Sequence, residues 1–218
     1  MYIKKYFIDV KKIIQKRNKW LYFVLFSTFL ISYFLFFYLG KFLNVYYPEY
    51  SSKIITEFYK QDLFKNIRSL MEQENYVRIF FIIFIHNFSL SVINLLSGLT
   101  AIAPFILILA NGSIIGFLFG VTYSITKYSL LHFVSLYAIL LLELLSMILA
   151  GTEGLYLLYS IINPQKIWKT KSRKKSIAKT FGENIKILIL VGVILLIAGV
   201  IEVFSIYYQS KLNNQIII

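Results

Sequence analysis

The sequence predicts an all-α fold, a polytopic membrane protein built as a five-transmembrane-helix bundle with small-residue helix packing. Of its 218 residues, 58% are apolar and only 15% are charged, whereas soluble domains carry about 25% charged residues. The apolar residues form long runs. Two stretches beside these runs, residues 1–20 and 163–184, carry +12 of the net charge of +13. Basic clusters next to apolar spans are typical of cytoplasmic loops in membrane proteins, so we expect no nucleic-acid partner.

Five spans are expected, at about residues 20–39, 79–96, 101–124, 131–152 and 185–208, in a single membrane domain over residues 20–208. Each is close to the ~20 apolar residues that cross a bilayer. The first is too long for the core of a signal peptide and is expected to remain as an anchor. The fourth apolar run continues to residue 162, which makes about 50 Å of helix. We expect this span to end near Gly151-Thr152-Glu153-Gly154, with a separate re-entrant piece as the alternative.

The basic clusters predict the orientation in the cell membrane: N-terminus cytoplasmic, C-terminus extracytoplasmic. Residues 1–19 have an apolar face opposite a row of lysines, which predicts a basic amphipathic helix on the inner leaflet. Residues 41–75 have no net charge and are expected to form an extracytoplasmic helical loop. Residues 163–184 are expected to be a basic cytoplasmic loop, and residues 209–218 a short extracytoplasmic tail.

The basic loop is expected to contact anionic lipid headgroups, with a solvated loop that only sets the topology as the alternative. Its basic residues are Lys166, Lys169, Lys171, Arg173, Lys174, Lys175 and Lys179.

Small residues recur along one side of four of the five spans. The set is Gly98, Gly112, Gly116, Gly120, Ala150, Gly154 and Gly199. Such residues let helix backbones approach closely. The double GxxxG of Gly112, Gly116 and Gly120 is therefore expected at a helix–helix contact, either within one bundle or across a homodimer. The first span consists almost entirely of bulky residues and is expected to lie at the periphery.

Six polar residues lie inside the apolar runs: His86, Asn87, Asn94, Asn111, Glu143 and Glu202. An intramembrane carboxylate is costly, about 2.5–3.5 kcal/mol on the insertion scale, and neither glutamate has a cation in its own span. Glu143 is expected to face the bundle, with an asparagine amide of the second or third span as its partner. The carboxyls are expected to be protonated, bonded to amides, or placed along a wet cavity. Glu202 lies nearer the outer interface and is the weaker candidate.

Sequence motifs for catalysis are missing. The chain has no HExxH, GxSxG or GxxxxGK[ST] motif, no cysteine and only two histidines, which lie in different spans. We therefore expect no enzyme activity, no catalytic residue, no metal site and no cofactor.

The order of these residues resembles the stage II sporulation protein M family of integral membrane proteins over about residues 80–205. The matching positions are Asn87, Asn94, Gly98, Pro104, Asn111-Gly112, Gly116, Glu143, Ala150-Gly151-x-x-Gly154 and Ile197-Ala198-x-x-Ile201-Glu202. The resemblance implies five spans and a non-enzymatic role. The founding member is a membrane scaffold in engulfment that works with two peptidoglycan-degrading partners. One departure is that family members commonly place a His-Gly pair before the fourth-span glutamate, where this chain has Ala138-Ile139-Leu140.

Two functions follow from these observations. The first is a membrane scaffold or assembly protein that recruits other membrane proteins within the bilayer or at its surfaces. The alternative is a permease or channel subunit, working with a separate ATPase, in which the carboxylates and asparagines line a polar path. A dry interior with both carboxyls bonded to neighbouring helices favours the scaffold, and a continuous hydrated cavity favours transport.

Overall fold

The computed structural model describes residues 2–122 and 130–216, and the regular elements of this part of the chain are all helices. They are α1 (Tyr2–Lys16), α2 (Lys19–Tyr46), α3 (Pro48–Tyr59), α4 (Asp62–Glu72), α5 (Tyr76–Ser97), the 3-10 turn η1 (Gly98–Thr100), α6 (Ala103–Thr122), α7 (Leu130–Ile162), α8 (Pro164–Trp168) and α9 (Arg173–Ile216). Five of them, α2, α5, α6, α7 and α9, are long and apolar enough to cross a membrane. The predicted five-span, all-α fold is confirmed.

Local sequence signals set several helix starts. The side chain of Asn18 accepts a hydrogen bond from the Trp20 amide at 3.0 Å and caps α2. Pro48 occupies the first turn of α3, where a missing N–H costs nothing. Asn75 caps α5 by accepting a bond from the Arg78 amide at 3.2 Å.

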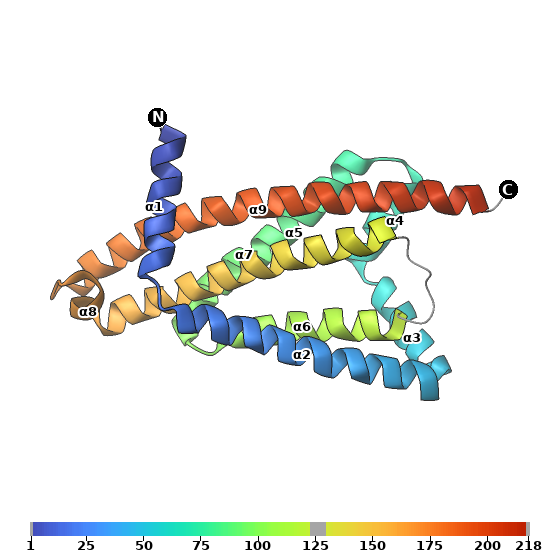
Figure 1. Cartoon of the computed structure of the whole chain (residues 1–218), viewed down its shortest axis with the longest axis horizontal. Helices are drawn as coiled ribbons and strands as arrows, with labels where there is room; N and C mark the ends of the chain where they lie inside the picture. Colours follow the sequence, from blue (N-terminus) through green and yellow to red (C-terminus); the bar gives the residue numbers. More distant parts are fainter. Residues whose placement is uncertain (1, 123–129, 217–218) are drawn as a thin grey trace.

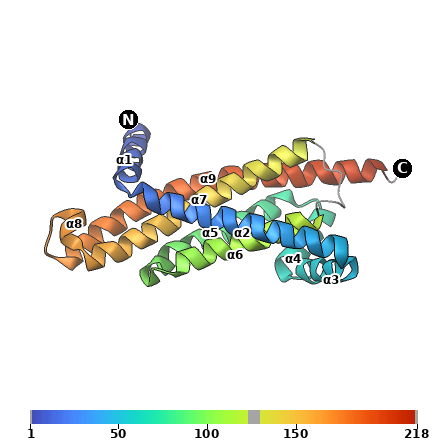
Figure 2. The ribbon, with the colours of Figure 1, turned by 60° about the horizontal axis from the view of Figure 1, so that its bottom comes forward.

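The long helices lie roughly along one axis and define two ends of the molecule (Figures 1 and 2). We call the end with α8 and the first turns of α9 the basic end, because it carries the positive cluster. The other, which we call the loop end, carries α3 and α4. Helix α1 projects sideways near the basic end, and α9 ends at the loop end (Figure 1). Helices α2 and α6 form one close pair, and α7 and α9 form another.

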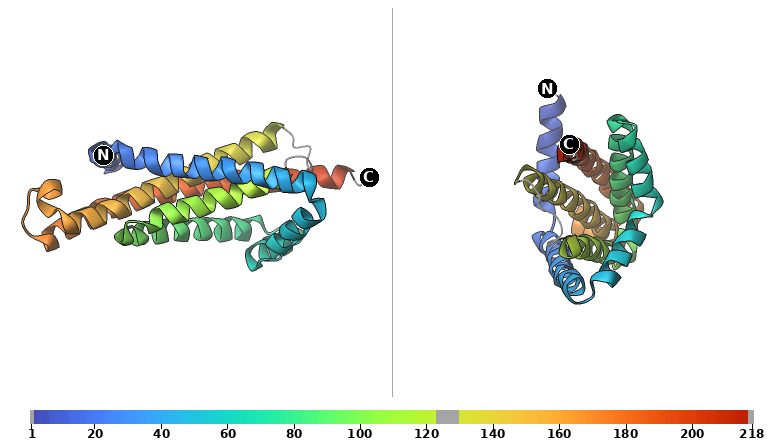
Figure 3. Two further views of the ribbon diagram at one scale, coloured as in Figure 1. Left: turned by 90° about the horizontal axis from the view of Figure 1, so that it is seen from below. Right: turned by 90° about the vertical axis from the view of Figure 1, so that its right-hand side faces the viewer.

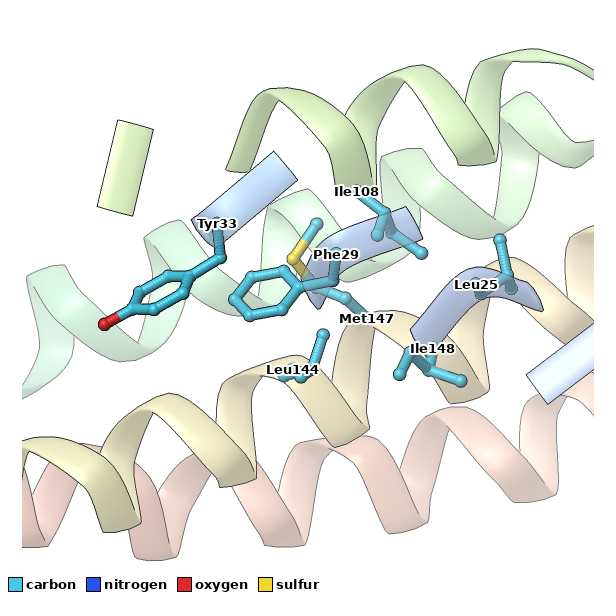
Figure 4. Close-up of a cluster of buried hydrophobic side chains, with 7 residues drawn as sticks. All are labelled: Leu25, Phe29, Tyr33, Ile108, Leu144, Met147 and Ile148. Atoms are coloured by element: carbon cyan, nitrogen blue, oxygen red, sulfur yellow. The ribbon is translucent and has the colours of Figure 1, made fainter. Parts of the chain in front are cut away.

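The largest core cluster joins α2 to α6 and α7 (Figure 4). Its members are Leu25, Phe29 and Tyr33 of α2, Ile108 of α6, and Leu144, Met147 and Ile148 of α7. The expectation that the first span lies at the periphery is therefore wrong. The physical reason is close backbone approach, since the glycine face of α6 lies against backbone atoms of Phe29, Tyr33 and Phe37 in α2.

Helix α7 runs without interruption through Gly151 and Gly154, which excludes a separate re-entrant piece. The glycines allow close helix contact here and do not create a turn. The basic segment 163–184 is also more ordered than a loop, because it contains α8 and the start of α9. Helix α9 has 44 residues and extends beyond both sides of a ~30 Å hydrocarbon core.

Candidate functional site

A cavity of about 540 Å³ lies among α5, α6, α7 and α9, and side chains of α3 and α4 line one part of it. The end-on view shows α3 and α4 bridging the space from α2 to α5 (Figure 3). Most lining residues are apolar, and the polar ones are Gln61, His86, Asn87, Ser91, Asn111, Glu143 and Glu202. The fold thus collects five of the six intramembrane polar candidates in one cavity. Asn94 is the one outside it.

Glu143 points into the bundle and has an amide partner from the second span. The Asn87 side-chain amide donates a hydrogen bond to Glu143 Oε1, one of the three partners that the sequence allowed. Glu202 of α9 lines the same cavity as Glu143. The Oε2 atom of Glu202 is buried and has no hydrogen-bond partner among the described residues.

The other two asparagines bind Met147 of α7 instead of a carboxyl group. The Asn94 amide donates to the Met147 carbonyl oxygen at 2.8 Å, and the Asn111 amide contacts the Met147 sulfur. Asn94 is completely buried and connects α5 to α7. His86 lines the cavity but is itself exposed.

The helix glycines bring backbones into direct contact. A Cβ on Gly98 would lie 2.2 Å from the Gly154 carbonyl carbon, and a Cβ on Gly116 would lie 2.2 Å from the backbone carbonyl oxygen of Tyr33. Gly112 and Gly120 face α2 in the same way, so the double GxxxG packs within one chain. Ala150 is fully buried. The contact at Gly199 is less close, because a Cβ there would lie 3.2 Å from the Phe80 ring and meet no backbone atom among its nearest neighbours.

A buried ion pair at the basic end was missed by the sequence reasoning. Arg17, in the bend between α1 and α2, donates to both carboxylate oxygens of Glu153 on α7, from Nε at 2.9 Å and from Nη2 at 2.5 Å. Its Nη1 lies 3.0 Å from Glu183 of α9, and its guanidinium stacks 4.4 Å from the Tyr156 ring centroid. Arg17 and Glu153 are only 4% and 1% exposed.

The environment of Arg17 keeps its charge. Burial lowers the pKa of Arg17. The hydrogen bonds to Glu153 and the negative charges of Glu153 and Glu183 raise it by more than burial lowers it, so the net shift of the pKa is upward. Such bidentate arginine–carboxylate pairs are strong and geometrically specific. Two sequence signals were available: Arg17 is the only arginine in residues 1–20, and Glu153 lies in an apolar run. Neither indicates the other, because the bend that joins them is a tertiary feature.

A family model described as Stage II sporulation protein M matches residues 23–205 of the chain. The chain belongs to this family. The match covers α5, α6 and α7, most of α2 and α9, and every described lining residue of the cavity, and it confirms the resemblance seen in the sequence. Helix α1 and Arg17 precede the match, whereas both glutamates that bind Arg17 lie within it. No curated protein and no solved structure matches the chain.

The seven basic residues predicted to meet lipid are all exposed at the basic end of this family member. Lys179 lies 5.4 Å from the Trp168 ring centroid, and Lys16 of α1 lies 5.7 Å from it. The Trp168 indole N–H donates to the Thr180 hydroxyl at 2.8 Å. This arrangement places an aromatic ring among cations, which is common at membrane–water interfaces.

Proposed function

We propose that this protein is an integral membrane scaffold that recruits partners within the membrane or at its surfaces, without catalysis of its own. The observation that supports the proposal is the packing of the basic half of the bundle. There the backbones of Gly98 and Gly154 touch, and Arg17 and Glu153 pair in the interior. The described lining of the cavity includes none of these four residues. A bundle packed this closely suits assembly better than conduction.

The proposed partners are anionic lipid headgroups, other membrane proteins and a second copy of the chain. Exposed lysines and arginines at the basic end suit the first of these. Broad apolar faces on the long helices suit the others, since helix association in lipid relies on packing.

Photo-crosslinking in the native membrane tests the scaffold. A photoreactive residue replaces an exposed position of α2 such as Phe34, and the buried position Phe29 serves as the matched control. We expect one discrete protein adduct from neighbouring exposed positions and none from position 29. If no exposed position on any of the five long helices gave a protein adduct, the scaffold proposal would be contradicted.

We also propose the orientation with the basic end in the cytoplasm. Because the chain has no cysteine, Lys60→Cys in α3–α4 gives a single thiol for labelling. Membrane-impermeant maleimide should label it from outside intact cells. Labelling only after permeabilisation would reverse the orientation.

The second candidate function, a permease or channel subunit working with a separate ATPase, is supported by the cavity with its two carboxyl groups. Solute flux through proteoliposomes that is lost in Glu143→Gln at unchanged melting temperature would favour it over the scaffold. Absence of flux together with discrete crosslinks would leave the scaffold as the function.

A further inference from the structure

We infer that the cavity binds a small organic cation, an ammonium group carried on an apolar body. The inference goes beyond the proposed scaffold, because it concerns what the cavity holds and not which proteins the outer faces meet. It combines the charge of the cavity, its unpaired polar atoms, and its size and lining.

The cavity lining carries acidic side chains without basic ones among the described residues. Glu143 and Glu202 both line it, and its described lining includes no lysine or arginine. Two carboxyl groups in one low-dielectric site do not both ionise without a countercharge. An ammonium group supplies a positive charge and three hydrogen-bond donors, and ionised carboxylates only accept. A protonated amine therefore complements the pair in both charge and hydrogen bonding.

Two polar atoms of the cavity lining have no partner. Glu202 Oε2 and Ser91 Oγ are both buried, and neither makes a hydrogen bond to any described residue. Ser91 is only 1% exposed. Buried polar atoms are nearly always bonded, and a hydrogen-bond donor placed in the cavity would complement the unpaired carboxylate oxygen of Glu202. Asn87, by contrast, already donates to Glu143.

The size and lining favour an organic cation over a metal ion. The volume of about 540 Å³ is far larger than the ~30 Å³ that one water occupies in the liquid. Over the residues that the structure describes, no three His, Cys, Asp or Glu side chains are grouped to hold a metal. Phe58 and Phe64 line the loop-end side, with ring centroids 4.8 Å apart. Aromatic faces attract both apolar groups and cations.

Binding is tested with the full chain in phosphatidylcholine nanodiscs, which have no net charge to attract amines. The probe is 2-phenylethylamine, and its neutral analogue 2-phenylethanol is the control ligand. We expect the amine to raise the melting temperature and to bind saturably by calorimetry, and the alcohol to do neither. Glu202→Gln should weaken amine binding at least tenfold, whereas Glu72→Gln, the same change at an exposed site outside the cavity, should bind like wild type.

Ser91→Ala separates ligand binding from a structural role. Removing an unpaired buried hydroxyl should leave the melting temperature of the free protein unchanged or raised, and should reduce the shift caused by the amine. Equal shifts from the amine and the alcohol, no binding of the amine, or wild-type amine affinity in Glu202→Gln would each overturn the inference. Crosslinking at the outer faces does not depend on the cavity, so the scaffold and the cation site fail separately.

Discussion

Two interior regions of the molecule each contain one glutamate from α7 and one from α9. The two regions differ in whether a cation neutralises these glutamates. At the basic end, Glu153 and Glu183 share Arg17, which enters from the bend between α1 and α2. In the cavity, Glu143 and Glu202 share no cation from the described residues, and Glu143 has only the Asn87 amide. A buried carboxylate with a bidentate arginine holds helices together. A buried pair of carboxyl groups without a cation of its own can bind a cation from outside the chain.

The largest expected effect comes from removing the cation of the paired region. Arg17→Met should lower the free energy of unfolding by about 3–5 kcal/mol, because Glu153 is left buried without its partner. Arg78→Met, at an exposed position, is the control. Unfolding in detergent, followed by tryptophan fluorescence and circular dichroism, measures the difference. A melting temperature equal to that of wild type would show that the buried pair does not hold α7 to the bend.

The same substitution in both regions sharpens the contrast. Glu153→Gln weakens the bond to Arg17 and should lower the melting temperature. Glu202→Gln removes no ion pair and should leave it unchanged or raise it. Equal losses in the two variants would mean that Glu202 has a structural partner of its own.

A second comparison concerns close backbone contacts. Gly116→Ala places a Cβ against the Tyr33 carbonyl oxygen and should cost about 1–3 kcal/mol by overpacking. Gly182→Ala on α9 is the matched control, since a Cβ there meets nothing within 4 Å, and it should stabilise the helix slightly. Thermal melts of the two variants test the α2–α6 contact. Loss of stability in Gly182→Ala alone would contradict it.

The cavity pair gives a graded prediction at Glu143. Glu143→Gln keeps a hydrogen-bonding side chain for Asn87 and should melt like wild type. Glu143→Leu leaves the amide of Asn87 unpaired and should cost about 1–3 kcal/mol. Measuring both variants separates a structural hydrogen bond from a need for charge. A melting temperature that falls as far in the glutamine variant as in the leucine variant would mean that the ionised carboxylate stabilises the fold.

Hydropathy and charge clustering were enough to predict five spans and the all-α fold, because a bilayer imposes length and composition on each helix. Asn87 and Asn94 of α5 and Gly98 of η1, which stand out in the sequence, all contact α7. The partners on other helices could not be predicted. Gly112, Gly116 and Gly120 indicate that a helix packs closely, but not that it is α2. Arg17 contributed only to a count of charges, because its contact with Glu153 depends on a bend without a periodic signature.

The smallest expected effect lies at a partly exposed ion pair between α1 and α9. Asp9 of α1 accepts a hydrogen bond from the Lys186 ammonium of α9 at 2.8 Å, and this bond, with the charge of Lys186, holds the pKa of Asp9 below its usual value. A lowered carboxyl pKa stabilises the fold above the unfolded pKa, and that stability is lost as the pH falls through the folded pKa. Asp9→Asn should therefore melt slightly below wild type at pH 7, and this deficit should shrink as the pH falls below the unfolded pKa of about 3.9. The difference at pH 7 should also shrink in high salt, because both partners are partly exposed and exposed pairs are screened. The Arg17 variant should keep its deficit in the same salt, since its pair is buried. If the melting temperature of Asp9→Asn stayed below that of wild type in high salt, the Asp9–Lys186 pair would behave like the buried Arg17–Glu153 pair, and the distinction between them would fail.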